Sequence, residues 1–228
     1  MADEPTTSSG ADRFQAAIRR FDDENARDPY LELLEGVARP RELIHAQRLS
    51  AWVAQLCPQA SEELRLAARC QHLCRWMIPR NSQKMTRGGY LRWRNDLKAF
   101  HARMAGEILR SVGYSDQTIA GVQALNLKKN FPHDPDSRVL EDALCLVFLE
   151  HQLAGLARRT AAEKIVGALR KSWKKMTPAA RELALQLPLG PSEKALLNQA
   201  LSEENSGPVK DSSPSTAITR PTAAPDCR

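Results

Sequence analysis

The sequence lacks the long apolar segments that membrane and secreted proteins require. No run of about 18 apolar residues occurs, so no transmembrane helix is predicted. The first residues, MADEPTTSSGADRF, are polar and acidic and contain no apolar signal segment. We therefore expect a cytoplasmic protein without a membrane partner, and no exposed heptad pattern indicates its oligomeric state.

Cysteine is also scarce, and its pattern does not indicate a zinc site. The chain has five cysteines, an odd number, and most of them lie in segments with helical periodicity. Cys70 and Cys74 are spaced to share a helix face, but no second ligand pair of the usual kind follows. We expect reduced, buried thiols, which are typical of cytosolic proteins.

No internal repeat and no convincing alternation of apolar and polar residues is present, so no sheet is predicted. Apolar residues instead recur with helical spacing in nearly every segment. Residues 1–10 are rich in Ser and Thr, and 203–228 are rich in Pro, Ser and Thr, so we expect both ends to be disordered. The prediction is a single all-α domain over residues 11–202.

Turn-forming and capping residues mark where the predicted helices begin and end. Pro40 precedes one helix, Ser61 is the expected N-cap of the next, and Gly113 ends a long one. The segment 138–159 is the most apolar and should form the central helix. The principal predicted helices cover residues 41–56, 61–78, 91–113, 138–159 and 160–176.

Three histidines and one aspartate, His45, His72, His101 and Asp142, each lie in a separate apolar segment. A bare polar group in such a segment is costly unless it is paired. Imidazole and carboxylate are ligands that first-row metals prefer, and helices of a bundle can each point one ligand inward. The four residues therefore predict one divalent metal (Mn, Fe, Co or Zn) that activates water or binds phosphate oxygens. The alternative is four scattered, hydrogen-bonded core residues.

The order of these residues resembles the HD superfamily of metal-dependent phosphohydrolases over about residues 40–150. His45 is similar to the first histidine of that pattern, and LAARCQHLCRW resembles the helix that carries its His-Asp pair. His101 resembles an additional histidine of some members, and Asp142 the terminal aspartate. The resemblance implies an HD-like helical domain that hydrolyses a phosphorylated small molecule or a nucleotide.

The defining His-Asp pair is replaced here by Gln71-His72. Two alignments are possible. If Gln71 aligns with the histidine of the pair, His72 replaces the aspartate. If His72 aligns with the histidine, Leu73 replaces the aspartate. We expect Gln71 to orient water or a ligand and Glu141 to orient a histidine. The resemblance also implies that Lys128 faces the leaving group.

A more extensive resemblance covers nearly the whole domain. The segments ARCQHLCRWMIPR, GGYLRWRNDLKAFHA, VLEDALCLVFLE and KIVGALRKSWKKMTP are similar to an uncharacterised bacterial and fungal family, domain of unknown function number four-two-zero-two. Membership implies an intracellular all-α domain and no established reaction.

Basic and aromatic residues gather around the Gly88-Gly89 pair, between His72 and His101. The cluster consists of Arg75, Trp76, Arg80, Lys84, Arg87, Tyr90, Arg92, Trp93, Arg94 and Lys98. Because guanidinium groups bind phosphate bidentately, we expect phosphate contacts from Arg75, Arg80 and Arg94. The alternative is a solvated loop whose tryptophans lie in the core.

A second basic stretch contains Arg170, Lys171, Lys174 and Lys175. It could contact nucleic acid, but we interpret it as the solvated C-terminal turn of a helix. The net charge of +6 favours anionic partners only weakly. Two functions therefore stay open: a metal-dependent phosphohydrolase, and a non-catalytic helical module that binds a nucleotide, RNA or a protein partner.

Overall fold

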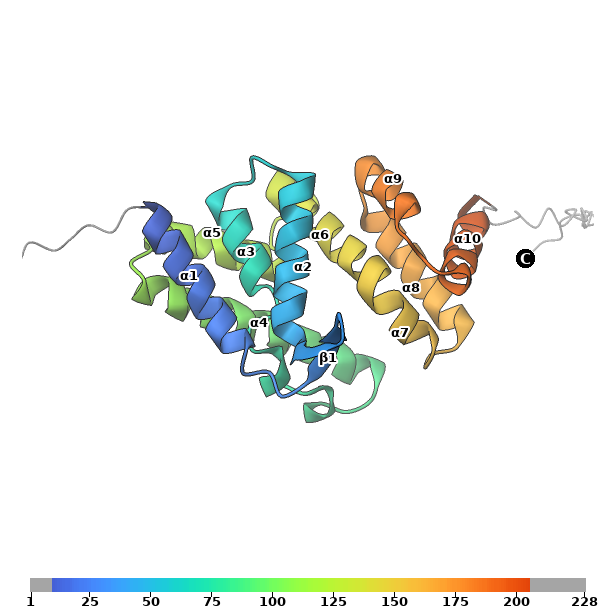
Figure 1. Cartoon of the computed structure of the whole chain (residues 1–228), viewed down its shortest axis with the longest axis horizontal. Helices are drawn as coiled ribbons and strands as arrows, with labels where there is room; N and C mark the ends of the chain where they lie inside the picture. The colour runs from blue at the N-terminus through green and yellow to red at the C-terminus, as the bar shows by residue number, and fades with distance from the viewer. Residues whose placement is uncertain (1–9, 206–228) are drawn as a thin grey trace, which may run out of the picture.

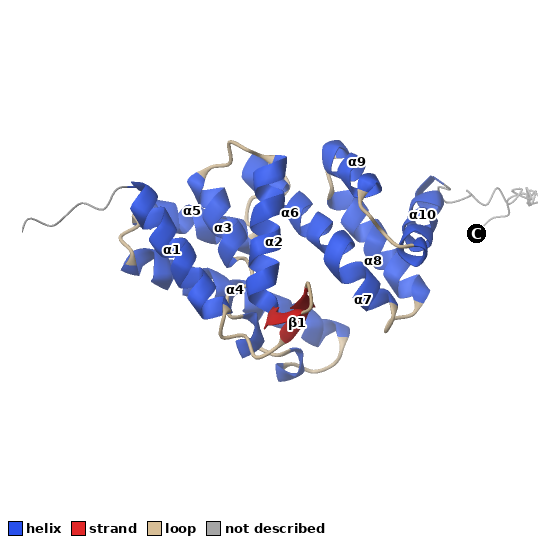
Figure 2. Ribbon diagram, in the orientation of Figure 1, coloured by secondary structure: helices blue, strands red, loops and turns tan. Residues whose placement is uncertain are grey.

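The structure, a computed structural model, describes residues 10–205 of the chain. This part contains ten α-helices and one short two-stranded sheet, which confirms the predicted all-α domain (Figure 1, Figure 2). The disorder expected of the chain ends concerns residues outside this range, except that Gly10 and residues 203–205 belong to the first and last helices. None of the described helices is both long enough and apolar enough to cross a membrane.

The first six helices enclose one hydrophobic core. They are α1 (Gly10–Asn25), α2 (Arg41–Leu56), α3 (Glu62–Cys70), α4 (Arg87–Ser111), α5 (Asp116–Leu127) and α6 (Pro135–Val147). Phe21, Leu49, Leu64 and Leu109 are fully buried within this core. Figure 1 shows α1 to α5 gathered on one side of the molecule, with α6 leading toward the later helices.

A second hydrophobic core is built by the later helices. These elements are the π-helical turn η3 (Phe148–Gln152), α7 (Leu153–Ala157), α8 (Ala162–Lys175), α9 (Pro178–Gln186) and α10 (Pro191–Asn205). Trp52 of α2 packs against both cores, and its Nε1 donates a hydrogen bond to Glu150 Oε2 at 2.8 Å. This bridge joins the two halves of the domain.

A small hairpin departs from the sequence prediction. The strands β1 (Leu31–Leu34) and β2 (Val37–Pro40) pair antiparallel, with Leu34 opposite Val37. The two turn residues between them, Glu35 and Gly36, both have positive φ (52° and 79°), which the right-handed twist of a tight hairpin favours. Each strand has only four residues, which is too short for a period-2 pattern to stand out.

Two predicted helices are interrupted, and both interruptions matter for the site. The segment 61–78 is helical only to Cys70; the chain then turns through Cys74, at φ 55°, into the 3-10 turn η1 (Arg75–Met77). His72 therefore lies in a turn. The predicted central helix changes to the π-helical turn η3 after Val147, and such turns are frequent at functional sites.

The Gly88-Gly89 pair lies in the first turn of α4 rather than in a loop. Thr86 is the N-cap, and its Oγ1 accepts a hydrogen bond from Gly89 N at 3.1 Å. A Cβ atom at position 89 would collide with the backbone oxygen of Lys84. Glycine at this position therefore lets the preceding loop, including the 3-10 turn η2 (Arg80–Ser82), fold back against the start of α4.

Candidate functional site

The structure brings three of the four predicted metal ligands together. His45 extends from α2, His72 from the turn after α3, and His101 from α4. The rings of His45 and His72 stack with centroids 4.2 Å apart and planes 10° apart, and the His72 and His101 centroids are 5.9 Å apart. We call these residues the imidazole cluster.

Each imidazole of the cluster has a neighbour at its Nδ1 atom. His45 Nδ1 accepts a hydrogen bond from Gln152 Nε2 at 3.3 Å, and His101 Nδ1 donates to the Leu73 carbonyl oxygen at 2.7 Å. His72 Nδ1 lies 3.4 Å from Glu42 Oε2. The Nε2 atom of His45 is buried and has no hydrogen-bond partner. Contacts at Nδ1 fix the orientation of each ring. They leave the Nε2 lone pair free for another partner in His72 and His101, whereas His45, which accepts at Nδ1, carries its proton on Nε2.

The imidazole cluster is uncharged at neutral pH. Burial holds the pKa values of His45 and His72 well below the ordinary value of a histidine. Repulsion between charged His45 and charged His72 lowers the pKa of His45 further, and the charge of Arg75 lowers that of His72. Burial also lowers the pKa of His101 to about 4. Uncharged rings can stack closely without repulsion, and each keeps one nitrogen lone pair.

Glu42 is a buried member of the site that sequence reasoning missed. Its Oε1 lies 3.5 Å from Arg75 Nε and 3.6 Å from Arg41 Nη2. The backbone N–H of Glu42 donates to Asp28 Oδ2 at 3.0 Å, which anchors the first turn of α2. The sequence contains one indication of this role. Glu42 lies three residues before His45, and residues at that spacing share a helix face.

Asp142 is held by a different partner. Its two carboxylate oxygens accept hydrogen bonds from Thr177 N at 2.9 Å and from Thr177 Oγ1 at 2.6 Å. Burial raises the pKa of Asp142, and the two hydrogen bonds offset part of that effect. Because Thr177 is also the N-cap of α9, through Ala180 N, the carboxylate fastens α6 to α9.

The predicted four-ligand metal site is therefore not assembled in this arrangement. Among residues 10–205, no group of three or more His, Cys, Asp or Glu side chains is placed to hold a metal ion. The imidazole cluster offers suitable donor atoms, but Asp142 does not complete it. We assign no chemical step to a metal, and metal binding stays a prediction.

Glu141, expected to orient a histidine, instead contacts two lysines. Lys128 Nζ donates to its Oε2, and Lys175 Nζ donates to its Oε1 at 2.8 Å. Burial would raise the pKa of Glu141, but the two ammonium groups outweigh it and hold the pKa below its ordinary value. Glu141 thus positions Lys128 and Lys175.

A large basic pocket opens beside the imidazole cluster. Its volume is about 1050 Å³, and one face of α4 and one face of α8 form two of its walls. Gln71, His72 and His101 also line it. Among residues 10–202, whose side chains the structure describes, eight basic side chains and no Asp or Glu line the basic pocket: Arg75, Arg94, Lys98, Lys128, Lys164, Lys171, Lys174 and Lys175.

Much of this positive charge is uncompensated. Within the described part of the chain, four lining lysines have no carboxylate at ion-pair distance: Lys98, Lys164, Lys171 and Lys174. Burial lowers the pKa of Lys98, and the charges of Lys128 and Arg94 add to that effect. A concave surface of one charge sign concentrates its field and attracts anions.

The predicted phosphate contacts divide into two groups. Arg75 and Arg94 line the basic pocket. Arg80 does not, because its guanidinium donates hydrogen bonds to the backbone oxygens of the following loop. Arg80 therefore shapes the loop before α4. Gln71 lines the basic pocket as well, and its Oε1 is buried without a hydrogen-bond partner.

α8 contributes to the basic pocket, which the sequence does not predict. Lys171, Lys174 and Lys175 are exposed near the end of this helix, and they line the basic pocket together with Lys164. Only the fold shows that this face of α8 stands opposite α4. The signal available in the sequence was the spacing of Lys164, Lys171 and Lys175, which places them on one face of a helix.

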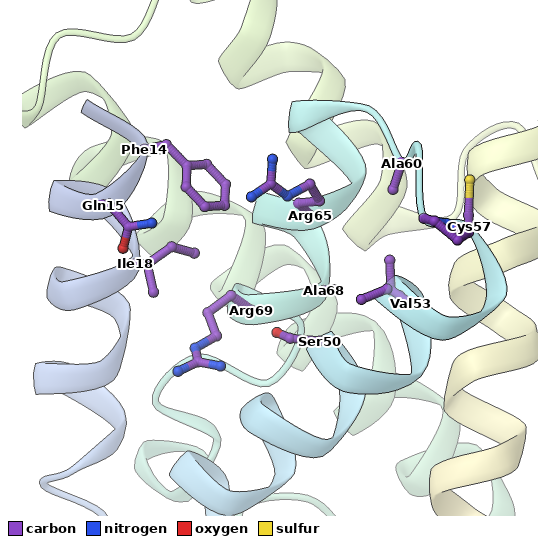
Figure 3. A pocket seen from close by; sticks show the side chains of 12 residues that line it. Phe14, Gln15, Ile18, Ser50, Val53, Cys57, Ala60, Arg65, Ala68 and Arg69 are labelled. Atoms are coloured by element: carbon purple, nitrogen blue, oxygen red, sulfur yellow. The ribbon is translucent and has the colours of Figure 1, made fainter. Parts of the chain in front are cut away.

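A second cavity, of about 280 Å³, lies between α1, α2 and α3 (Figure 3). It is mainly apolar, with Phe14, Ile18 and Val53 in its lining. Its arginines are already engaged: Arg69 binds Asp22 at 2.6 Å, and Arg65 lies over the Phe14 ring. This cavity is smaller, and both of its arginines already have a partner, so the basic pocket is the candidate functional site.

Comparison with known proteins agrees with the more extensive of the two sequence resemblances. No curated protein and no solved structure matches the chain significantly. A family model described as "Domain of unknown function (DUF4202)" matches residues 15–197, which include every element that lines the basic pocket. The chain therefore belongs to the DUF4202 family of domains of unknown function.

Proposed function

We propose that this protein binds a phosphorylated small molecule or a nucleotide in the basic pocket and hydrolyses a phosphate bond next to the imidazole cluster. One observation supports the proposal: within the described part of the chain, eight basic side chains and no carboxylate line a cavity that reaches His72 and His101. Arginine and lysine bind phosphate groups through charge-assisted hydrogen bonds, which are stronger than hydrogen bonds between neutral groups.

The size and charge of the basic pocket support a ligand with phosphate groups. Its volume of about 1050 Å³ lies at the upper end of ordinary ligand pockets, which hold roughly 300–1,000 Å³. Arg75 belongs to the 3-10 turn η1 and Arg94 to α4, so the cations of the basic pocket come from several elements. Fixed cations on several sides stabilise the negative charge that develops during phosphoryl transfer.

Hydrolysis is assigned to the end of the basic pocket at Gln71 and His72. The Gln71 side chain lines the basic pocket, and its amide can form a hydrogen bond with the attacking water. As the water oxygen bonds to phosphorus and the leaving-group oxygen departs, His72 Nε2 takes the proton of the water and passes it to the leaving group. Glu42 beside Nδ1 orients the ring and stabilises its charged form.

A metal-dependent version of this reaction is a separate form of the proposal, because the described residues do not assemble a complete set of ligands. Neutral imidazole nitrogens are common metal ligands, and the order of the three histidines resembles the HD superfamily. A metal bound there would lower the pKa of water and polarise a phosphate. Its uptake would require a rearrangement of the stacked rings.

The second candidate function is non-catalytic binding. Its support is the Gln71-His72 sequence where HD enzymes have a His-Asp pair, together with the engagement of Asp142 by Thr177. Such a module would bind the same phosphorylated ligand and release it unchanged. Turnover separates this candidate from the hydrolase.

The binding test compares two arginines of α4. We expect nucleotides to bind the wild type, measured by calorimetry, and the Arg94→Gln variant to bind at least about tenfold more weakly. Arg103→Gln is the control, because Arg103 lies on the same helix and pairs with Glu107 outside the basic pocket. Absence of binding by a panel of nucleotides and sugar phosphates would show that the proposal is wrong.

The hydrolysis test measures phosphate release from the ligands that bind, with added Mg²⁺, Mn²⁺ or Co²⁺ and without metal. We expect His72→Asn to abolish release and His133→Asn, on an exposed loop, to leave it unchanged. Elemental analysis of untagged protein, purified without chelator, reports whether a metal is held and lost in His72→Asn. Binding without release under every condition identifies the non-catalytic module.

A further inference from the structure

We infer that the ligand carries several phosphates in an extended row, as in a linear phosphoanhydride chain, and that α8 binds the part of this chain farthest from the imidazole cluster. The inference rests on the proposed function and narrows its substrate class. Nucleoside triphosphates and inorganic polyphosphate share this chemistry.

The lysines of α8 form one continuous row. Lys164, Lys171 and Lys175 are seven and then four residues apart, so they lie on one helix face. At 1.5 Å per residue this row extends over about 16 Å. Lys164 and Lys171 have no carboxylate at ion-pair distance in the described part of the chain, so their charge is available to a ligand.

The facing wall on α4 adds two cations to this row. Tyr90, Arg94, Lys98 and His101 lie at spacings of three or four residues and line the basic pocket, and Arg94 and Lys98 carry positive charge. Cations therefore stand on both walls. A single phosphate compensates only the cations near it, because salt screens interactions beyond about 8 Å at physiological ionic strength. An extended chain of phosphates compensates the whole row.

Gly167 leaves open space in the α8 wall. It lines the basic pocket between Lys164 and Lys171, and a Cβ atom there would meet no other atom within 4 Å. Packing therefore does not require glycine, and glycine weakens a helix relative to other residues. We attribute Gly167 to ligand access, because the missing side chain lets a phosphate chain lie close to α8.

Tyr90 can distinguish a nucleoside triphosphate from inorganic polyphosphate as the ligand. Its side chain lines the basic pocket, is 43% exposed, and has Arg94 5.8 Å from its ring centroid. An accessible aromatic ring beside a phosphate site can stack on a nucleobase. A nucleotide would use this contact, whereas inorganic tripolyphosphate has nothing to place there.

The experiment measures the affinities of AMP, ADP, ATP and inorganic tripolyphosphate at about 0.15 M salt, where long-range attraction is screened. We expect the wild-type affinity to rise about tenfold or more from AMP to ATP, which is at least the effect of one additional charge-assisted contact. The Lys164→Gln/Lys171→Gln variant should lose this rise and still bind AMP. Lys194→Gln, an exposed lysine of α10 outside the basic pocket, should behave as the wild type.

Gly167→Leu separates a blocked ligand path from a damaged fold. The substitution meets open space and favours the helix, so thermal unfolding of the free protein should occur at the same or a higher temperature. ATP and tripolyphosphate should bind at least about tenfold more weakly, because the leucine occupies their path. Tyr90→Leu should weaken ATP alone if the source is a nucleotide, and neither ligand if it is inorganic polyphosphate.

The outcomes separate the inference from the proposed function. If no phosphorylated ligand binds, both are wrong. If AMP binds as tightly as ATP, and the α8 variants bind ATP like the wild type, the inference is wrong and the proposed function stands. Tighter binding of a single-stranded oligoribonucleotide than of ATP, with a steep salt dependence, would replace the phosphoanhydride chain by nucleic acid.

Discussion

Glu42 Oε2 lies 3.4 Å from His72 Nδ1, and through this contact one buried carboxylate joins the imidazole cluster to the arginines of the basic pocket. The other oxygen of Glu42 lies 3.5 Å from Arg75 Nε. Glu42 thus orients a neutral ring on one side and compensates a half-buried guanidinium on the other. Its side chain is 4% exposed, so water screens neither contact well.

The first prediction concerns this carboxylate. Glu42→Gln should lower the free energy of unfolding by about 3 kcal/mol, because it removes the compensating charge from a buried site and leaves Arg75 unpaired. Urea denaturation measures the change. Glu107→Gln removes an exposed partner of Arg103 and should change stability by less than about 0.5 kcal/mol. Equal, small effects of the two substitutions would contradict the assigned role of Glu42.

The second prediction concerns pH and His101. Burial lowers the folded-state pKa of His101 from 6.5 to about 4, so the unfolded chain takes up this proton first as the pH falls. The folded state should therefore lose stability from about pH 6.5 down to pH 4, by up to about 3 kcal/mol through this group. His101→Asn, which does not titrate, should reduce the slope of unfolding free energy against pH. An unchanged slope would sink the prediction.

The third prediction distinguishes a structural Asp142 from a metal ligand. Asp142→Asn and Thr177→Ala should each destabilise the protein by about 1–2 kcal/mol, because each breaks the link between α6 and the cap of α9. Their effects should be less than additive in the double variant, since both act on one contact. Neither should change metal content or nucleotide affinity. If the Asp142→Asn variant loses bound metal and the Thr177→Ala variant does not, Asp142 is a metal ligand and this prediction is wrong.

The fourth prediction compares two adjacent glycines. Gly89→Ala should destabilise the protein by about 1–3 kcal/mol, because the new Cβ collides with the Lys84 backbone. Gly88→Ala should be neutral or stabilising by up to about 1 kcal/mol, because its Cβ would make only an ordinary contact of 3.7 Å with Arg92. Thermal unfolding of the two variants tests this. Similar melting temperatures would contradict the close approach at Gly89.

Local sequence signals predicted the helices better than the interruptions between them. Ser61, the expected N-cap, caps α3 by accepting a hydrogen bond from the backbone N–H of Leu64. The end of α3 at Cys70 escaped prediction, because the apolar spacing continues beyond it. Cys74 adopts a left-handed conformation, and Asn25 Oδ1 on α1 accepts its N–H at 3.2 Å. Asn25 and Cys74 are far apart in the chain, so their contact does not produce a pattern in the apolar spacing of the sequence.

The site was predicted only in part, for a similar reason. The apolar surroundings of His45, His72 and His101 marked them as residues that need partners, and the fold brings the three together. The same signal surrounds Asp142, but its partner is Thr177. Periodicity shows that a polar group is buried, and it does not show which other buried group it meets.

The all-α class, the main helices and the polar residues that had to be buried and paired could all be predicted from the sequence. These follow from apolar spacing and capping, which act over a few residues. The tertiary structure alone decided that Glu42 meets His72, that Asp142 fastens α9, and that the lysines of α8 stand across a cavity from α4. Such relationships depend on how helices distant in the sequence pack, because electrostatic and hydrogen-bonding partners are set by distance in space.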